Sequence, residues 1–168
     1  TPIQVTMNPP LACYCIPGNT DCTLDDEILN VNFAGINNSS TGCTGTGYTN
    51  YAATVAPATV IAGGTFPMSV RVGPGGNEFV GAWIDANQNG VFETSEFTLV
   101  GAAASGGAGV TITGNVTVPA NANITTTRMR VRVRFGTALT GTNACIPYGF
   151  GETEDYSVTI VPCVPLSI

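Results

Sequence analysis

Short runs in which apolar and polar residues alternate recur along this 168-residue chain, and they constrain its fold more than any other feature. Alternation places successive side chains on opposite faces of a β-strand, so each run predicts a strand with one apolar face. Gly, Asn and Pro fill the gaps between the runs, as in NNSSTG and GPGGN, and are typical of turns. The apolar positions are Leu29, Val31 and Phe33; Phe66, Met68, Val70 and Val72; Val110 and Ile112; Met129, Val131, Val133 and Phe135; and Tyr156, Val158 and Ile160.

This pattern predicts an all-β fold, an antiparallel β-sandwich of jelly-roll or Ig-like type with seven to nine short strands. The segment from Phe79 to Ile84 is apolar almost throughout, and we expect a central strand there. A chain of this length can bury the core of one domain.

Charged residues make up 10% of the chain, against about 25% in an ordinary soluble domain. Five Arg, no Lys and no His stand against eleven Asp and Glu, which gives a net charge of −6. We therefore expect no nucleic-acid binding, because that depends on Lys and Arg at the phosphates. The absence of His excludes Ser–His and Cys–His nucleophile pairs and His metal ligands, so any catalysis would depend on carboxylates.

The segment WIDANQNGVFETSEF has the ligand spacing of a calcium loop. Asp85, Asn87, Asn89, Gly90 and Glu96 stand at positions 1, 3, 5, 6 and 12 of the EF-hand pattern. The complete predicted ligand set is the side chains of Asp85, Asn87, Asn89 and Glu96, the carbonyl of Val91, and Glu93 directly or through water.

The predicted loop begins where a strand ends and returns into the sheet after at most one helical turn. Without two long helices to swing apart, calcium at the edge of the sandwich is expected to stabilise the fold rather than to switch it. Two Asn ligands lower the charge of the site and favour a dissociation constant of about 10⁻⁴ to 10⁻³ M. The alternative is a polar Asn-Gly turn that binds no metal.

Four of the five Arg, at positions 128, 130, 132 and 134, share one face of a predicted strand. The acidic cluster Glu152, Glu154 and Asp155 precedes the last strand. It either pairs with the Arg row across the sheet or contributes a carboxylate to the calcium site, and the sequence does not choose. A carboxylate glycosidase using Glu152 and Glu154 is a further alternative, which we do not favour.

Six cysteines, Cys13, Cys15, Cys22, Cys43, Cys145 and Cys163, are dispersed and form no CxxC pair. Three disulfides in an oxidising, extracellular location are favoured over buried thiols in a reduced chain. Neither a signal peptide nor a stretch of 18 apolar residues is visible, so we expect the mature form of an exported protein without membrane insertion.

The two ends of the chain, TPIQVTMNPPLA and VTIVPCVPLSI, carry apolar residues with little charge. Each is either an ordinary edge strand or a strand exchanged with a neighbouring copy, which would build a polymer. The expected division is an extended N-terminal arm over 1–13, a β-sandwich over 14–161 and a C-terminal tail over 162–168.

Several motifs in a fixed order resemble the GEVED domain, a family of β-sandwich modules common in secreted and surface-attached proteins of Bacteroidetes. They are Tyr14-Cys15, WIDANQNGVF at 83–92, TTRMRVRV at 126–133, a lone Cys145, and GETEDY at 151–156. Thr153 replaces the Val of the family signature, and Asn89 stands where the family often has Asp. The resemblance implies a non-catalytic module and disulfides Cys15–Cys145 and Cys22–Cys43, which would leave Cys13–Cys163 to join the termini.

These observations together predict a non-enzymatic structural or adhesive module of the cell exterior, stabilised by calcium and disulfides. It is expected to self-associate by strand exchange as the repeating subunit of a surface filament or layer. The alternative is a carbohydrate-binding module of a larger secreted protein, with Tyr48, Tyr51 and Tyr148 contacting a cell-surface glycan.

Overall fold

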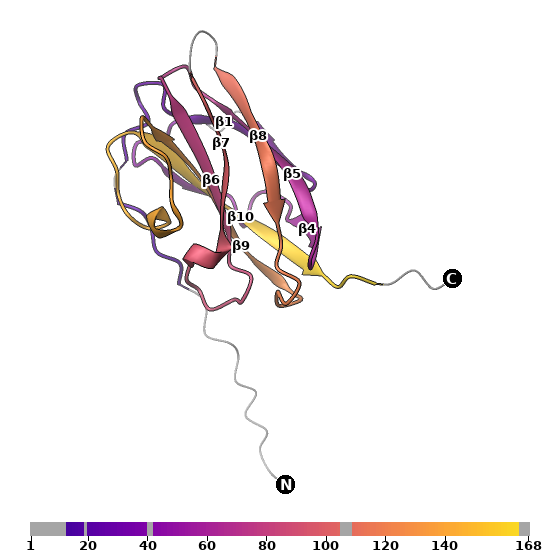
Figure 1. Cartoon of the computed structure of the whole chain (residues 1–168). Helices are drawn as coiled ribbons and strands as arrows, with labels where there is room; N and C mark the ends of the chain where they lie inside the picture. Colours follow the sequence, from indigo (N-terminus) through magenta and orange to yellow (C-terminus); the bar gives the residue numbers. More distant parts are fainter. Residues whose placement is uncertain (1–12, 19, 40–41, 105–108, 165–168) are drawn as a thin grey trace.

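The computed structural model describes residues 13–18, 20–39, 42–104 and 109–164, which form ten strands and two short 3-10 helices (Figure 1). One sheet has the order β2-β1-β5-β8, and the other has the order β3-β10-β9-β6-β7 with β4 also paired to β10. The first sheet comprises β1 (Ile28–Phe33), β2 (Ile36–Ser39), β5 (Thr65–Val72) and β8 (Val110–Thr117). The second comprises β3 (Tyr48–Asn50), β4 (Ala58–Ile61), β6 (Glu78–Ile84), β7 (Phe97–Ala103), β9 (Thr126–Phe135) and β10 (Gly151–Val161).

The all-β class predicted from the alternation is confirmed, with two differences. The described residues form ten strands rather than seven to nine, and the second sheet is mixed rather than purely antiparallel. The two short strands β3 and β4 both run parallel to β10, beside its first and second halves. Such three- and four-residue strands carry too few side chains for alternation to reveal them.

The main core lies between the two sheets and contains the residues whose alternation predicted the strands. Val31 and Met68 from the first sheet belong to the same buried cluster as Val80 and Val131 from the second. Two predicted core residues are exceptions. Phe135, at the end of β9, is 41% exposed. Leu29 is half-buried outside the cluster, because the register shift between Ile28 and Asn30 brings Ile28 into the core instead. The strand expected at Phe79 to Ile84 is β6, which lies between β7 and β9.

A second, smaller apolar cluster lies on the outer face of the β6–β9–β10 sheet. Trp83, Phe92, Leu139 and Ala144 form it, and Tyr14, Phe97, Cys145 and Tyr148 pack against them. The segment between β9 and β10, gold at the left of Figure 1, carries the 3-10 helix η2 (Gly141–Asn143). Because this segment covers the sheet, β9 and the start of β10 are buried on both faces.

Among the described residues, no helix has the length and apolar character needed to cross a membrane. The expected N-terminal arm falls almost entirely on residues 1–12, which lie outside the described part of the chain.

Candidate functional site

The predicted calcium loop connects β6 to β7 and is organised by side-chain hydrogen bonds to its own backbone. The amide of Asn89 donates to Oδ1 of Asn87 (3.0 Å), and the amide of Val91 donates to Oδ1 of Asn89 (2.8 Å). Gly90 has φ of 81°, a left-handed conformation that glycine adopts without strain. The expected helical turn is present as the 3-10 helix η1 (Thr94–Glu96).

Asp85, the first residue of the loop, is fully buried at the end of β6. Its carboxylate accepts hydrogen bonds from the amides of Asn89 (3.2 Å) and Gly90 (3.0 Å) and from the hydroxyl of Tyr14 (2.7 Å). Burial, followed by the bond to Asp85, raises the pKa of Tyr14 to about 12, so this hydroxyl stays protonated and donates. Tyr14 thereby joins the loop to a segment 71 residues earlier in the chain.

The two glutamates of the loop have different contacts. Glu96 accepts from the amide of Ala86 (2.8 Å) and from that of Glu93 (3.0 Å), so it closes the loop across its base. Burial raises the pKa of Glu96, and the neighbouring charge of Asp85 adds to that rise. Glu93 instead accepts from the side-chain amides of Asn87 and Asn89, both at 3.0 Å.

The structure thus brings together the side chains of Asp85, Asn87, Asn89, Glu93 and Glu96 in one folded loop, while the side chain of Val91 is exposed. Each oxygen has more than one lone pair, so an Asn carbonyl that accepts a backbone amide keeps capacity for a hard cation. Within the described ranges, no group of three or more His, Cys, Asp or Glu side chains is arranged to hold a metal ion. The loop is prefolded by its own hydrogen bonds, and calcium binding there stays a prediction.

The predicted acidic cluster divides between the two faces of β10. Asp155 lies on the outer face opposite Arg130, whereas Glu152 and Glu154 lie opposite Val133 and Val131 on the face that meets the core. Glu154 accepts from the hydroxyl of Tyr156 (2.6 Å), and Glu152 accepts from the amide of Ile28 (2.7 Å). A contribution of this cluster to the calcium site stays a prediction.

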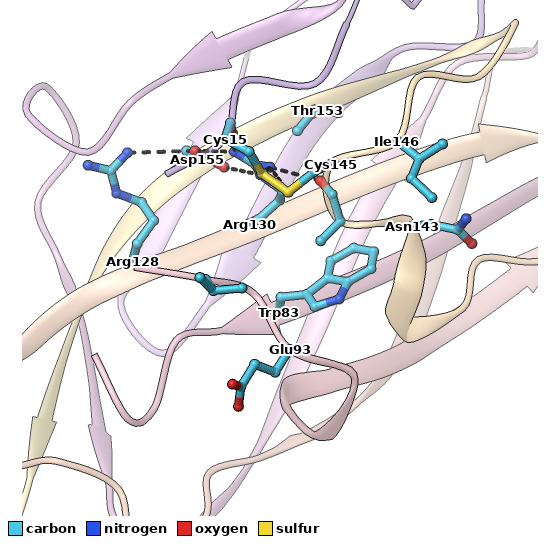
Figure 2. The surroundings of a disulfide bond; sticks show 12 residues. Cys15, Trp83, Glu93, Arg128, Arg130, Asn143, Cys145, Ile146, Thr153 and Asp155 are labelled. Atoms are coloured by element: carbon cyan, nitrogen blue, oxygen red, sulfur yellow. Dashed lines mark hydrogen bonds and ion pairs between the residues drawn. A yellow bond between two sulfur atoms is a disulfide. The ribbon is translucent and has the colours of Figure 1, made fainter. Parts of the chain in front are cut away.

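The outer face of β9 and β10 carries a buried charge network beside the disulfide Cys15–Cys145 (Figure 2). Arg130, with no solvent exposure, binds Asp155 through two nitrogens at 2.8 and 2.9 Å. It also donates to the carbonyls of Ala144 (2.8 Å) and Cys15 (2.7 Å). Pairing of the Arg row with the acidic cluster is therefore confirmed for Asp155.

Arg132 is equally buried but has no carboxylate partner in the described part of the chain. It donates to Thr153 Oγ1 (2.8 Å) and to the carbonyls of Asn143 and Ile146, and its guanidinium lies 4.1 Å from the ring centre of Tyr148. Burial lowers the pKa of Arg132 to about 10, which leaves it charged at neutral pH. These contacts attach the segment before β10 to the sheet.

The three tyrosines predicted to contact a glycan are half-buried and do not form one platform. Tyr48 donates to Asp155 (2.9 Å), and burial raises its pKa to about 12, with Asp155 adding to the rise. Tyr148 donates to the carbonyl of Val133 (2.7 Å) beneath Arg132. Tyr51 stacks on Tyr156 with 5.6 Å between ring centres. Trp83 is fully buried and donates to the carbonyl of Gly141 (3.1 Å).

The structure contains the disulfides Cys15–Cys145 and Cys22–Cys43, the two pairs that the family resemblance implied. The third expected pair is not formed, because Cys13 and Cys163 are exposed free thiols. Cys13 directly precedes Tyr14, which is bonded to the calcium loop, whereas Cys163 follows β10 in a groove with Ile61 and Ile124. The two ends of the domain therefore do not meet.

Sequence reasoning missed Tyr14 as a partner of Asp85, and it missed the burial of Arg130 and Arg132. One available signal was not used. Glu152 and Glu154 continue the alternation of Tyr156, Val158 and Ile160, so that pattern already placed both glutamates on the core side of the last strand.

The geometry defines a two-sheet all-β domain whose outer sheet face is covered by a disulfide-linked segment. Residues 79–159, from the start of β6 almost to the end of β10, match the model of the GEVED domain family. This part of the chain is therefore similar to the GEVED domain family, in agreement with the resemblance that its motifs indicated. Searches of curated proteins and of solved structures gave no match.

Proposed function

We propose that this chain is a non-enzymatic structural or adhesive module of the cell exterior, stabilised by calcium and disulfides, and that its copies associate into a surface filament or layer. The two disulfides are compatible with an extracellular location. Glu152 and Glu154, the pair weighed as glycosidase carboxylates, are fully buried and lie on the core side of the sheet, where no substrate reaches them.

The observation that carries the proposal is an exterior with very few charges. Of the five Arg and eleven Asp and Glu, two Arg and six acids are buried. Net charge and mixed surface charge are what keep soluble domains apart, so a surface that places so much of its charge inside repels other copies weakly. The buried charged residues are Asp26, Glu78, Asp85, Arg130, Arg132, Glu152, Glu154 and Asp155.

Exposed apolar side chains near the end of β10 supply contact area for such association. Ile61 is 43% exposed and Ile124 51% exposed, and both line a groove together with Pro162 and Cys163. Grouped apolar side chains on a surface commonly mark interaction sites.

The calcium part of the proposal rests on the five matching positions and on the prefolded loop. With a dissociation constant of about 10⁻⁴ M, about 1 mM calcium stabilises the folded chain by about 1.4 kcal/mol. Thermal unfolding of the oxidised protein in calcium and in chelator measures this. Glu96→Gln should abolish most of the calcium-dependent rise in melting temperature, whereas the exposed neighbour Ser95→Ala should retain it. An equal rise in Glu96→Gln and wild type would contradict calcium binding at the loop.

Association is tested separately by light scattering over a wide concentration range and by negative-stain electron microscopy, with calcium present. Filaments or layers that grow with concentration are the expected result. Protein that stays monomeric at all concentrations, with both ends intact, would exclude the assembly part while leaving the calcium measurement valid.

A further inference from the structure

Two buried carboxylates lie far from the calcium loop, at the start of β6 and just before β1. Glu78 has no solvent exposure, and Asp26 is 3% exposed. Both oxygens of Glu78 and Oδ1 of Asp26 are buried without a hydrogen-bond partner. The two carboxyls face each other within hydrogen-bonding reach, and burial together with Asp26 raises the pKa of Glu78 to about 8.

Backbone hydrogen bonds hold together the two segments that carry this pair. The turn between β5 and β6 is bonded to the segment before β1, because Gly73 donates to the carbonyl of Glu27 (2.9 Å) and Gly75 to that of Asp25 (3.1 Å). A Cβ at Gly75 would lie 2.3 Å from Oδ1 of Asp26 and 2.8 Å from the carbonyl oxygen of Leu24. Only glycine lets these two oxygens approach the turn so closely.

Among the described residues, no basic side chain donates a hydrogen bond to either oxygen of Glu78 or to Oδ1 of Asp26. The ion pairs of the described residues join Arg128 and Arg130 to Asp155, on the outer face of the sheet, whereas Glu78 lies on the inner face beside Val80. An unpaired buried carboxylate costs several kcal/mol, and two that face each other add mutual repulsion. Such a pair therefore needs a positive partner, either a proton or a metal ion.

We propose that Asp26 and Glu78 bind a divalent calcium ion, in a second site that is separate from the loop at Asp85. The donors are all oxygens, which is the ligand type that calcium selects, and calcium readily adds main-chain carbonyls such as that of Leu24. Two acidic side chains from distant segments then join the turn before β6 to the segment that enters β1. The site clamps the two sheets together at one end of the core.

The test counts calcium ions bound per chain by equilibrium dialysis with metal analysis, on the full oxidised protein. Glu78→Gln removes one charge with little change in shape, and it should lose one bound calcium relative to the wild type. The same loss should follow in a Glu96→Gln background, so the result does not depend on whether the loop binds. Ser95→Ala is the matched control and should bind as many ions as the wild type.

An unchanged number of bound calcium ions in Glu78→Gln, with unchanged affinity, would overturn the proposal. In that case a melting temperature raised by the substitution in chelator would identify a shared proton as the partner of the pair. Asp26→Asn is the second variant if Glu78→Gln does not fold. In crystals of the unmodified chain soaked in terbium, an anomalous peak between the two carboxylates supports the site, and its absence counts against it.

Discussion

The two faces of the β9–β10 pair differ in whether their buried charges are compensated by partners within the protein. On the outer face, Arg130 has Asp155, two carbonyls and the ring of Phe92 around it, so its charge is compensated within the protein. On the inner face, Glu152 and Glu154 lie among apolar core residues, and each raises the electrostatic energy of its neighbour. The same two strands therefore hold a neutralised network on one side and an excess of acid on the other.

This difference determines what each face responds to. The compensated face depends on covalent and hydrogen-bonded partners and should be insensitive to pH near neutrality. The acidic face responds to protons, because burial raises the pKa of Glu152 there. Its stability should change with solution conditions.

The largest effect is expected from removing the disulfide that holds the cover on the outer face. Cys15 and Cys145 are 130 residues apart, so replacing both with Ser should destabilise the fold by about 5 kcal/mol in the loop-entropy model. Denaturant unfolding measures the loss. Replacing Cys22 and Cys43, 21 residues apart, should cost about 3 kcal/mol. A smaller loss for the long-range pair than for the short one would contradict the assigned role of the cover.

Breaking the charge pair beneath that cover should come next. Asp155→Asn leaves Arg130 buried with no carboxylate, and such changes cost about 3 to 5 kcal/mol. Arg128→Met is the control, since Arg128 is 22% exposed and lies 3.6 Å from the same carboxylate. That substitution should cost about 1 kcal/mol or less. Both losses are measured by denaturant unfolding. Equal losses in the two variants would show that the buried pair contributes no more to the free energy of unfolding than the partly exposed one.

The stability of the folded chain should depend on pH through the carboxylates of the inner face. Burial, with Glu154 and Glu27 nearby, raises the pKa of Glu152 to about 8, whereas an unfolded Glu titrates at about 4.3. Between these values the folded chain holds a proton that the unfolded chain has lost, so stability falls as pH rises, by roughly 1.4 kcal/mol per pH unit, and levels off above pH 8.

Glu152→Gln, measured from pH 5 to 8 in chelator, should remove this contribution and flatten the slope by about one proton. The amide can still accept from the Ile28 amide, so the fold keeps that hydrogen bond. A slope identical to that of the wild type would mean that Glu152 is ionised in the folded state and that the inner face has a partner for its charge.

The contrast between the two faces also shows which structural features could be predicted from the sequence. Alternation identified the core side of most long strands, because each such strand has one apolar face against the other sheet. It also placed the Arg row opposite that core and predicted the loop that follows β6. These features depend on residues close together in the chain.

What could not be predicted depends on long-range packing. The Arg row looks like an exposed polar face in the sequence, and its burial follows only from the segment between β9 and β10 and from Tyr14 and Cys15 lying over it. The Asp26–Glu78 pair joins segments that are 52 residues apart, with no local motif. The parallel strands β3 and β4 were missed because they are too short to alternate visibly.

The smallest predicted effect tests the link between the covered face and the calcium loop. Tyr14→Phe removes the hydroxyl that donates to Asp85 and keeps the ring, which stacks on Phe92 with 5.0 Å between centres. A half-buried hydrogen bond to a carboxylate that keeps two amide donors should cost about 1 to 1.5 kcal/mol. Tyr148→Phe, which loses a bond to the neutral carbonyl of Val133, is the matched control and should cost about 1 kcal/mol or less. If Tyr14→Phe is no more costly than this control in denaturant unfolding, the covered face and the loop are stabilised independently, and the outer network ends at Arg130 and Asp155.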